Sequence, residues 1–390
     1  MNPFLSRLSF RTAGESHGPE LTTILEGIPR GLKIDTDAID FDLRRRQGGA
    51  GRGGRQRIED DTVRITAGVR RGVTIGSPLC LVVANRDHKI DELPEPTRPR
   101  PGHADLSGAF RYDDHDIRGT LERASARETA ARVAAGGIAR QVLQAVGSEV
   151  FGFVRSVGDA ALPAELGATI ERDDLASLRQ IRDASKLYTL DGSVDAAMAR
   201  EVADAGREQD TVGGIVEVHA LGVLPGVGSH LQWHERLSAR LMGAVGSIHA
   251  FKGVEIGLGF ESARLRGSAV HDEILPAAPG GIVARGSNRA GGLEGGTTNG
   301  QSVVVRGAMK PISTLRKPLR SIDLTTGEPD EAGYERSDIC AVSAASVVAE
   351  AMVALVLADA VLARVGGETI EEFVRRHAEC RAAAIRLSRG

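Results

Sequence analysis

Two histidines occur in sequence contexts suited to proton transfer. Imidazole is the side chain that most readily exchanges protons near neutral pH. His17 lies in Gly-Glu-Ser-His-Gly and His103 in Arg-Pro-Gly-His-Ala-Asp, each beside a glycine that leaves room for a ligand. A hydrolase triad of Glu15, Ser16 and His17 is disfavoured because adjacent side chains diverge. The motifs alone leave open whether the two histidines are catalytic or simply occupy surface turns.

Arginines form the second candidate group. Residues 43–57 contain six arginines, five glycines and no acidic residue, so we expect a largely mobile loop. Guanidinium groups match carboxylates and phosphates in bidentate geometry, and a ligand with two carboxylates and a phosphate would need several. The alternatives are a solvated basic face and an Arg/Gly RNA-binding segment, although aromatic residues usually interleave such segments and none does here. The arginines of interest are Arg46, Arg52, Arg55, Arg57, Arg100, Arg123 and Arg127.

Three further segments could approach an anion or a cofactor. Arg123-Ala124-Ser125 precedes a predicted helix, whose first N–H groups and dipole favour negative charge. Residues 310–314 offer one cation and two hydroxyls without P-loop glycine spacing, and residues 291–298 form a glycine-rich loop. No Gly-x-Gly-x-x-Gly opens a helix after a strand, which argues against a Rossmann site, and the spacing of metal ligands is absent.

Hydrophobic periodicity predicts mixed strands and helices that would position these groups. Ser125 and Glu128 have the spacing of a capping box at the start of one helix. The predicted strands cover 8–13, 21–26, 63–67, 73–75, 79–83, 211–221 and 303–308, and the predicted helices cover 37–46, 125–146, 237–246, 341–365 and 369–386. This content indicates the α/β (α+β) class.

The bulk composition limits the compartment and the partners. A net charge of −3 argues against general binding of nucleic acid. Residues 1–10 lack a secretory signal, and charged residues interrupt the apolar stretch at 341–365, which we interpret as a core helix. Three widely spaced cysteines indicate free thiols in a reducing compartment: Cys80, Cys340 and Cys380. We therefore expect a cytoplasmic protein without membrane segments.

Six segments with notable residues follow one another in a fixed order. They are GESHG at 14–18, the arginine-glycine loop at 44–53, RPGHAD at 100–105, RASARETAARVAAG at 123–136, FKGVEIGLGF at 251–260 and KPIST at 310–314, with Arg336-Ser337-Asp338 later. Together they resemble the chorismate synthase family over about residues 8–362. The resemblance implies a single domain over 1–390, a sandwich with helices packed between sheets, terminal helices within 341–386, and a homotetramer.

The resemblance also implies an activity. Members of this family convert 5-enolpyruvylshikimate-3-phosphate (EPSP) to chorismate by 1,4-elimination of phosphate and a ring proton, the last common step toward aromatic amino acids. They need reduced FMN although the reaction is redox-neutral, and the flavin is reduced either with NADPH or by an external flavin reductase. Two alternatives remain: a flavin-dependent NADPH oxidoreductase, and an RNA-binding protein that uses the Arg/Gly loop.

The family's functional residues map onto this chain by position. His17 corresponds to a proton donor near the departing phosphate, His103 to a histidine at the flavin N1/O2 edge, and Asp338 to a group near flavin N5. The arginines expected to contact EPSP are Arg46, Arg52, Arg55, Arg100, Arg127 and Arg336, of which Arg46 and Arg52 are also linked to NADP. The expected FMN contacts are Arg123, Ala124, Ser125, His249, Ala250, Gly295, Lys310, Pro311, Ile312, Ser313, Thr314 and Arg336.

Three positions depart from the family pattern. Ala124 replaces a common serine, which removes one hydroxyl donor. His249 stands where Asn, Gln or Pro is more usual, so its flavin contact is in question. Residues 120–122, Thr-Leu-Glu, replace a stretch that contains glycine in many relatives. None of these changes removes an expected proton-transfer group.

Overall fold

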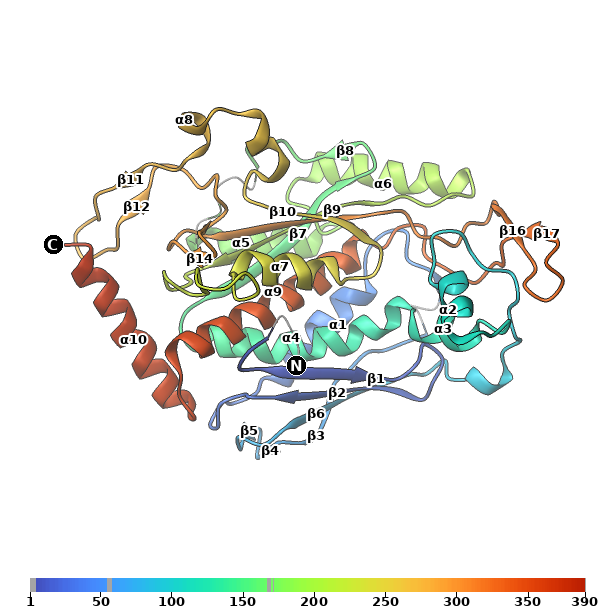
Figure 1. The fold of residues 1–390 in the computed structure, drawn as a ribbon, viewed down its shortest axis with the longest axis horizontal. Coiled ribbons are helices and arrows are strands. Elements are labelled where there is room, and N and C mark those ends of the chain that lie inside the picture. The colour runs from blue at the N-terminus through green and yellow to red at the C-terminus, as the bar shows by residue number, and fades with distance from the viewer. Residues whose placement is uncertain (1–4, 55–57, 167–169, 171, 390) are drawn as a thin grey trace.

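Two antiparallel sheets enclose a layer of helices (Figure 1). The computed structural model describes residues 5–54, 58–166, 170 and 172–389. The four-stranded sheet has the order β1 (Ser9–Ala13), β2 (Glu20–Glu26), β6 (Leu79–Ala84) and β3 (Arg64–Ala67). The five-stranded sheet has the order β10 (Phe251–Ile256), β15 (Val303–Met309), β9 (Gly214–Leu221), β7 (Glu149–Val157) and β8 (Ala160–Ala161).

The helices between the sheets are α1 (Thr36–Gln47), α4 (Thr129–Gln144), α7 (Leu237–Gly246) and α9 (Val342–Val365). Helix α4 packs on β2 and β6, whereas α9 packs on β7 and β9. Alternation along β7 places Val150 and Val154 in this central core and Phe151 and Phe153 in a second core on the other face. Helices lie between two sheets, as the predicted fold class requires, so that prediction is confirmed.

The remaining elements flank the sandwich. The other helices are α2 (Asp105–Tyr112), α3 (Arg118–Arg123), α5 (Leu175–Ala184), α6 (Gly192–Arg207), α8 (Gly267–Val270) and α10 (Ile370–Leu387). Short strands pair as β4 (Val69–Arg70) with β5 (Val73–Thr74), β11 (Ile274–Leu275) with β12 (Ala284–Arg285), β13 (Leu293–Glu294) with β14 (Thr297–Thr298), and β16 (Arg320–Ile322) with β17 (Pro329–Glu331). Helices α2 and α3 lie at the opposite end of the molecule from β14 (Figure 1).

Helix α9 is the central element of the core. Its length and composition would allow it to cross a membrane, yet its most apolar 18-residue window is wholly buried within the fold. Two acids interrupt its apolar surface, and both are paired. Glu350 accepts hydrogen bonds from Arg45 at 2.7 Å and Arg182 at 2.9 Å, and Asp359 binds Arg240. The interpretation of this segment as a core helix is therefore confirmed.

Small residues bring α4 and α9 close together. A Cβ atom added at Gly136 of α4 would lie 2.3 Å from the Cβ of Ala351 and 2.5 Å from its Cα. Alanines 130, 131, 134 and 135 surround this glycine in α4 and are all buried. This contact shows how a chain with only 3% aromatic residues fills its core, because the helix backbones approach closely enough that small side chains suffice.

Two expectations about the chain are wrong. The arginine-rich segment does not begin as a mobile loop, because residues 43–47 complete α1 and the backbones of Ala50 and Gly51 bond to residues 186 and 339. The capping box also fails. Ser125 caps a short 3₁₀ turn, Ala126–Glu128, while the Glu128 carboxylate binds Thr12 at 2.6 Å and Arg132 at 2.8 Å. Tertiary partners outweigh the local signal in both places.

Substitution of Gly136 tests the close helix contact. Gly136→Ala should lower the free energy of unfolding by about 1–3 kcal/mol, because the added methyl overpacks a rigid interface. Gly192→Ala is the control, since Gly192 opens α6 with nothing within 4 Å of its added Cβ, and it should change stability by no more than about 1 kcal/mol. Denaturant unfolding measures both, and equal stabilities for the two variants would contradict the packing argument.

Candidate active site

A buried carboxylate holds two of the predicted ligand-binding arginines together. Asp61 accepts hydrogen bonds from Arg46 at 2.9 Å and from Arg127 at 2.7 Å. Burial alone would raise the pKa of Asp61, but the charges of Arg46 and Arg127 outweigh it and hold the pKa below its usual range. Burial lowers the pKa of Arg46 to about 10, so this guanidinium stays charged at neutral pH.

Asn85 connects Arg127 to the turn that carries His17. Its side-chain oxygen accepts a bond from Arg127 Nε at 2.7 Å. Its amide nitrogen donates to the carbonyls of Gly18 at 2.7 Å and Glu15 at 3.2 Å. Arg46, Arg127 and the His17 turn thus belong to one hydrogen-bonded network, although its members are spread between positions 15 and 127 of the sequence.

The two ring nitrogens of His17 face different charged groups. Nδ1 lies 2.9 Å from a carboxylate oxygen of Glu122 in α3, whose side chain is completely buried. Nε2 lies 4.0 Å from a carboxylate oxygen of Asp87, and the Arg336 guanidinium is 3.5 Å from that same oxygen. His17 and Arg336, far apart in sequence, therefore converge on one carboxylate.

An ion pair between Arg52 and Asp338 lies beside Arg46. Arg52 bonds Asp338 at 2.6 Å and donates to the carbonyl of Arg46 at 3.4 Å, and Gly53 N–H also donates to Asp338. Asp338 and Thr314 line one small cavity of about 10 Å³, so this pair adjoins the residues around Arg100. Arg55 lies outside the described residues.

The segments around His103 and Lys310 meet through side chains. Arg100 donates to Asp105 at 2.8 Å and to Thr314 at 2.8 Å, and His103 Nδ1 lies 2.5 Å from Asp105. Burial would raise the pKa of Asp105, but hydrogen bonds from His103 and Arg100 outweigh it and keep the pKa well below its usual range. Ser313, which accepts from Lys310 at 2.8 Å, donates to the Gly102 carbonyl.

Most of the other residues expected to contact a cofactor border these groups. Ala250 adopts a left-handed backbone, with φ of 66°, and its carbonyl accepts from the Lys310 N–H at 2.9 Å. Ser125 donates to Ser16, next to His17, at 3.1 Å. Arg123 binds the carbonyls of residues 12 and 14.

His249 is partly buried, and one of its ring nitrogens is enclosed. Its Nδ1 has no hydrogen-bond partner among the residues that the structure describes. Burial, together with the nearby charge of Arg132, lowers the pKa of His249 to about 4, so the ring is neutral at physiological pH. A neutral imidazole nitrogen in this position could bond to a ligand.

Gly295 is the predicted contact that this chain does not bring to the site. It lies in the turn between β13 and β14 with nothing within 4 Å of an added Cβ. That turn is at the opposite end of the molecule from α2 and α3, which carry the residues around His103 and Glu122 (Figure 1).

Sequence reasoning identified the cations but missed most of their partners. The missed residues are Asp61, Asn85, Asp87, Asp105 and Glu122. Two weak signals were present: Asp105 lies within the RPGHAD motif, and Asp61 ends an acidic run, Glu59-Asp60-Asp61, shortly after the arginine-rich loop. Such signals could only suggest a partner and could not say which cation it binds.

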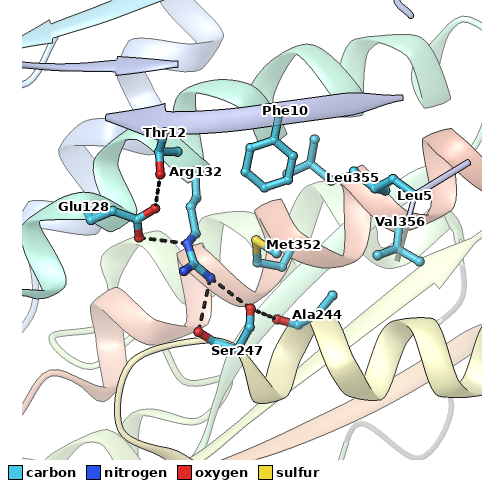
Figure 2. A pocket seen from close by; sticks show the side chains of 10 residues that line it. All are labelled: Leu5, Phe10, Thr12, Glu128, Arg132, Ala244, Ser247, Met352, Leu355 and Val356. Atoms are coloured by element: carbon cyan, nitrogen blue, oxygen red, sulfur yellow. Dashed lines mark hydrogen bonds and ion pairs between the residues drawn. The ribbon is translucent and has the colours of Figure 1, made fainter. Parts of the chain in front are cut away.

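A separate cavity lies away from these residues. It has a volume of about 190 Å³, between β1, α4, α7 and α9 (Figure 2). At one end Arg132 bonds Glu128 and Ser247, and at the other Phe10 and Met352 provide an apolar wall (Figure 2). None of the residues predicted for the site lines this cavity, and its polar groups bind one another.

Comparisons with known proteins identify the class and the family. They define an enzyme of mixed α/β structure that acts on a small molecule. The chain belongs to the chorismate synthase family, whose sequence profile matches residues 8–362 and whose members are lyases.

Individual relatives are similar over almost their whole length. The chorismate synthase of Geotalea uraniireducens is 51% identical, with 94% of this chain and 97% of the relative covered. That of Geobacter sulfurreducens is also 51% identical, with 95% and 98% covered. A crystal structure of chorismate synthase superimposes with a TM-score of 0.81 at 41% identity, and covers 98% of this chain and 99% of that one.

Replacement of Asp61 tests the role of the shared carboxylate. Asp61→Asn should lower the free energy of unfolding at pH 7 by about 3–5 kcal/mol, because buried Arg46 loses its paired carboxylate and Arg127 keeps only Glu59, 3.6 Å away. Since the folded pKa of Asp61 is depressed, its stabilisation is present above the unfolded value of about 3.9 and is lost as pH falls through the folded pKa. The variant should therefore lose less stability than wild type on acidification below about pH 4.

The neighbouring residue supplies the control. Asp60 pairs with Arg86 at 2.8 Å, and both side chains are more than half exposed. Asp60→Asn should cost no more than about 1 kcal/mol. Denaturant unfolding at several pH values measures both variants, and a small effect at Asp61 would show that the pair of arginines does not depend on it.

Proposed function

We propose that this chain catalyses the 1,4-elimination of phosphate and a ring proton from EPSP to give chorismate. Family membership supports the reaction, and one structural observation carries it. The Nε atoms of Arg46 and Arg52 are buried, and neither has a hydrogen-bond partner among the described residues. Unsatisfied guanidinium N–H groups are costly inside a protein, so an anionic ligand that accepts from them would be bound strongly.

Arginines around these two would complete the substrate site. Asp61 is shared by Arg46 and Arg127, and Asp105 by Arg100 and His103. Sharing leaves each guanidinium with further donors for carboxylates and phosphate of a substrate. We assign EPSP binding to Arg46, Arg52, Arg55, Arg100, Arg127 and Arg336, and NADP contacts to Arg46 and Arg52.

The residues around His103 and Lys310 fit a reduced FMN. The unpartnered Nδ1 of His249 offers a hydrogen bond, and Lys310, whose pKa burial lowers, offers a cation beside Ser313. We assign FMN binding to Arg123, Ala124, Ser125, His249, Ala250, Lys310 to Thr314 and Arg336. Reduced FMN would supply electron density that assists phosphate loss, without net redox change.

Three residues would handle protons. His17 would donate from Nε2 to the departing phosphate, since its Nδ1 is occupied by Glu122. His103, held by Asp105 at 2.5 Å, would keep a proton at the flavin N1/O2 edge. Asp338, fixed by Arg52 and Gly53, would assist proton removal near flavin N5.

The assembly and the surroundings follow from the same proposal. The β13–β14 turn that carries Gly295 lies at the opposite end of the chain from α2 and α3, and a contact supplied by another copy of the chain would suit the homotetramer expected for the family (Figure 1). A single domain is supported by a central core that runs from Leu8 to Phe373. A cytoplasmic location suits a small-molecule pathway, with FMN reduced either by NADPH on this chain or by an external flavin reductase.

One assay separates the candidate functions. Anaerobic incubation with EPSP and photoreduced FMN should release chorismate and phosphate together. A flavin-dependent oxidoreductase would instead consume NADPH without forming chorismate. An RNA-binding protein would show steeply salt-dependent RNA affinity and no flavin binding. Repeating the assay in air with NADPH identifies the source of reducing equivalents, and absence of chorismate in the anaerobic assay would refute the proposal.

His17→Ala tests the proton donor. The substitution should slow chorismate formation by about 10²- to 10⁴-fold, the usual contribution of a general acid. FMN affinity, followed by flavin fluorescence, should stay close to wild type. His234→Ala is the control, because His234 is an exposed loop residue that stacks edge-on against Trp233. If the substitution abolishes FMN binding instead, His17 has a different role.

A further inference from the structure

Glu122 is placed to control which nitrogen of His17 carries the proton. One of its oxygens accepts from the His17 backbone N–H at 2.7 Å. The other lies 2.9 Å from His17 Nδ1 and accepts from Arg118 at 3.3 Å. The carboxylate therefore binds both the backbone and the ring of His17. These two contacts fix the position and the rotation of the imidazole.

The neighbours of Glu122 require its carboxylate to be the acceptor in each hydrogen bond. The backbone N–H and Arg118 are donors without acceptor capacity. Burial would raise the pKa of Glu122, but the hydrogen bonds from His17 and Arg118 outweigh it and keep the pKa below its usual range. An ionised carboxylate has only lone pairs to offer, so a neutral His17 ring must place its proton on Nδ1.

Other charged groups lie on both sides of the His17 ring. Asp87 lies 4.0 Å from Nε2 and is itself paired with Lys89 at 3.1 Å and with Arg336 at 3.5 Å. On the Nδ1 side, Glu335 binds the far edge of Arg118 at 3.1 Å. The ring thus lies between a buried acid on one side and a partly open cluster of mixed charge on the other.

We propose that Glu122 is a positioning residue that keeps a proton on Nδ1 of His17 and directs Nε2 toward the substrate phosphate. This inference rests on the proposed function. When the C–O bond to phosphate breaks, the electron pair leaves with the phosphate and the Nε2 proton moves to it. The neutral ring that remains keeps its proton on Nδ1, hydrogen-bonded to Glu122. Nε2 then regains a proton from solvent.

The tautomer of His17 can be measured directly on the protein without substrate. Solid-state ¹⁵N NMR of histidine-labelled protein distinguishes protonated from unprotonated ring nitrogens, and the signal missing from His17→Ala assigns the residue. In a pH series, the neutral wild-type ring should carry its proton on Nδ1, whereas Glu122→Ala should shift it wholly or partly to Nε2. A wild-type proton on Nε2, or an unchanged tautomer in Glu122→Ala, would overturn the proposal.

Kinetics test whether Glu122 acts through His17. Glu122→Ala should lower kcat by about 10- to 100-fold with KM little changed, as expected for loss of an orienting partner. Glu122→Asp, which keeps the charge, should recover part of the rate and provides a folded variant if the alanine variant is unstable. In the His17→Ala background, Glu122→Ala should cause no further loss of kcat. Additive losses would show that Glu122 acts elsewhere.

Glu335→Ala provides the matched control. It removes the other carboxylate on Arg118 but leaves Glu122 and His17 in place, so tautomer and kcat should both stay at wild-type values. An effect as large as that of Glu122→Ala would assign the role to Arg118 and overturn the proposal. A wild-type protein that makes no chorismate would refute the proposed function, while the tautomer measurement would still decide the role of Glu122.

Discussion

The site depends on buried carboxylates that each hold two cationic groups. Asp61 is completely buried and binds Arg46 and Arg127, which come from two different helical segments. A buried guanidinium without a counter-charge is unfavourable, and two of them side by side repel each other. One carboxylate between them offsets both effects, and the buried Glu59, 3.6 Å from Arg127, adds a second counter-charge. The fold can thus hold several cations close together without losing its stability to their mutual repulsion.

Helix α1 connects this charge arrangement to the core. Its adjacent residues Arg45 and Arg46 point to different partners, since Arg45 binds Glu350 of the central helix while Arg46 binds Asp61. Burial would raise the pKa of Glu350, but the charges of Arg45 and Arg182 outweigh burial and lower the pKa to about 2. The carboxylate therefore remains ionised. The core ion pair therefore fixes the last turn of α1, and with it the direction from which Arg46 enters the site.

Local signals in the sequence predicted some of the elements and part of the site, whereas β7, α5 and α6 were not among the predicted segments. Helix α7 begins and ends where its apolar periodicity predicts, and α9 lies within one residue of its predicted start, because these signals reside in neighbouring residues. Pairing of charges is different. Arg127 and Asp61 are 66 residues apart and Arg52 and Asp338 are 286 apart, so no local pattern specifies them. The cationic residues could be identified from their residue type, whereas their acidic partners could be identified only from the fold.

The same long-range pairing suggests how a substrate anion could be recognised. Asp87 lies between His17 and Arg336, where a phosphate could also accept hydrogen bonds from both side chains. An incoming dianion carries more charge than this carboxylate and presents more acceptor oxygens, so it would compete favourably for both groups. The half-exposed Arg336 can move with little loss of packing, while buried Glu122 keeps the His17 ring still. The exposure of Arg336 would allow movement on one side of a bound anion, and the burial of Glu122 would restrict movement on the other.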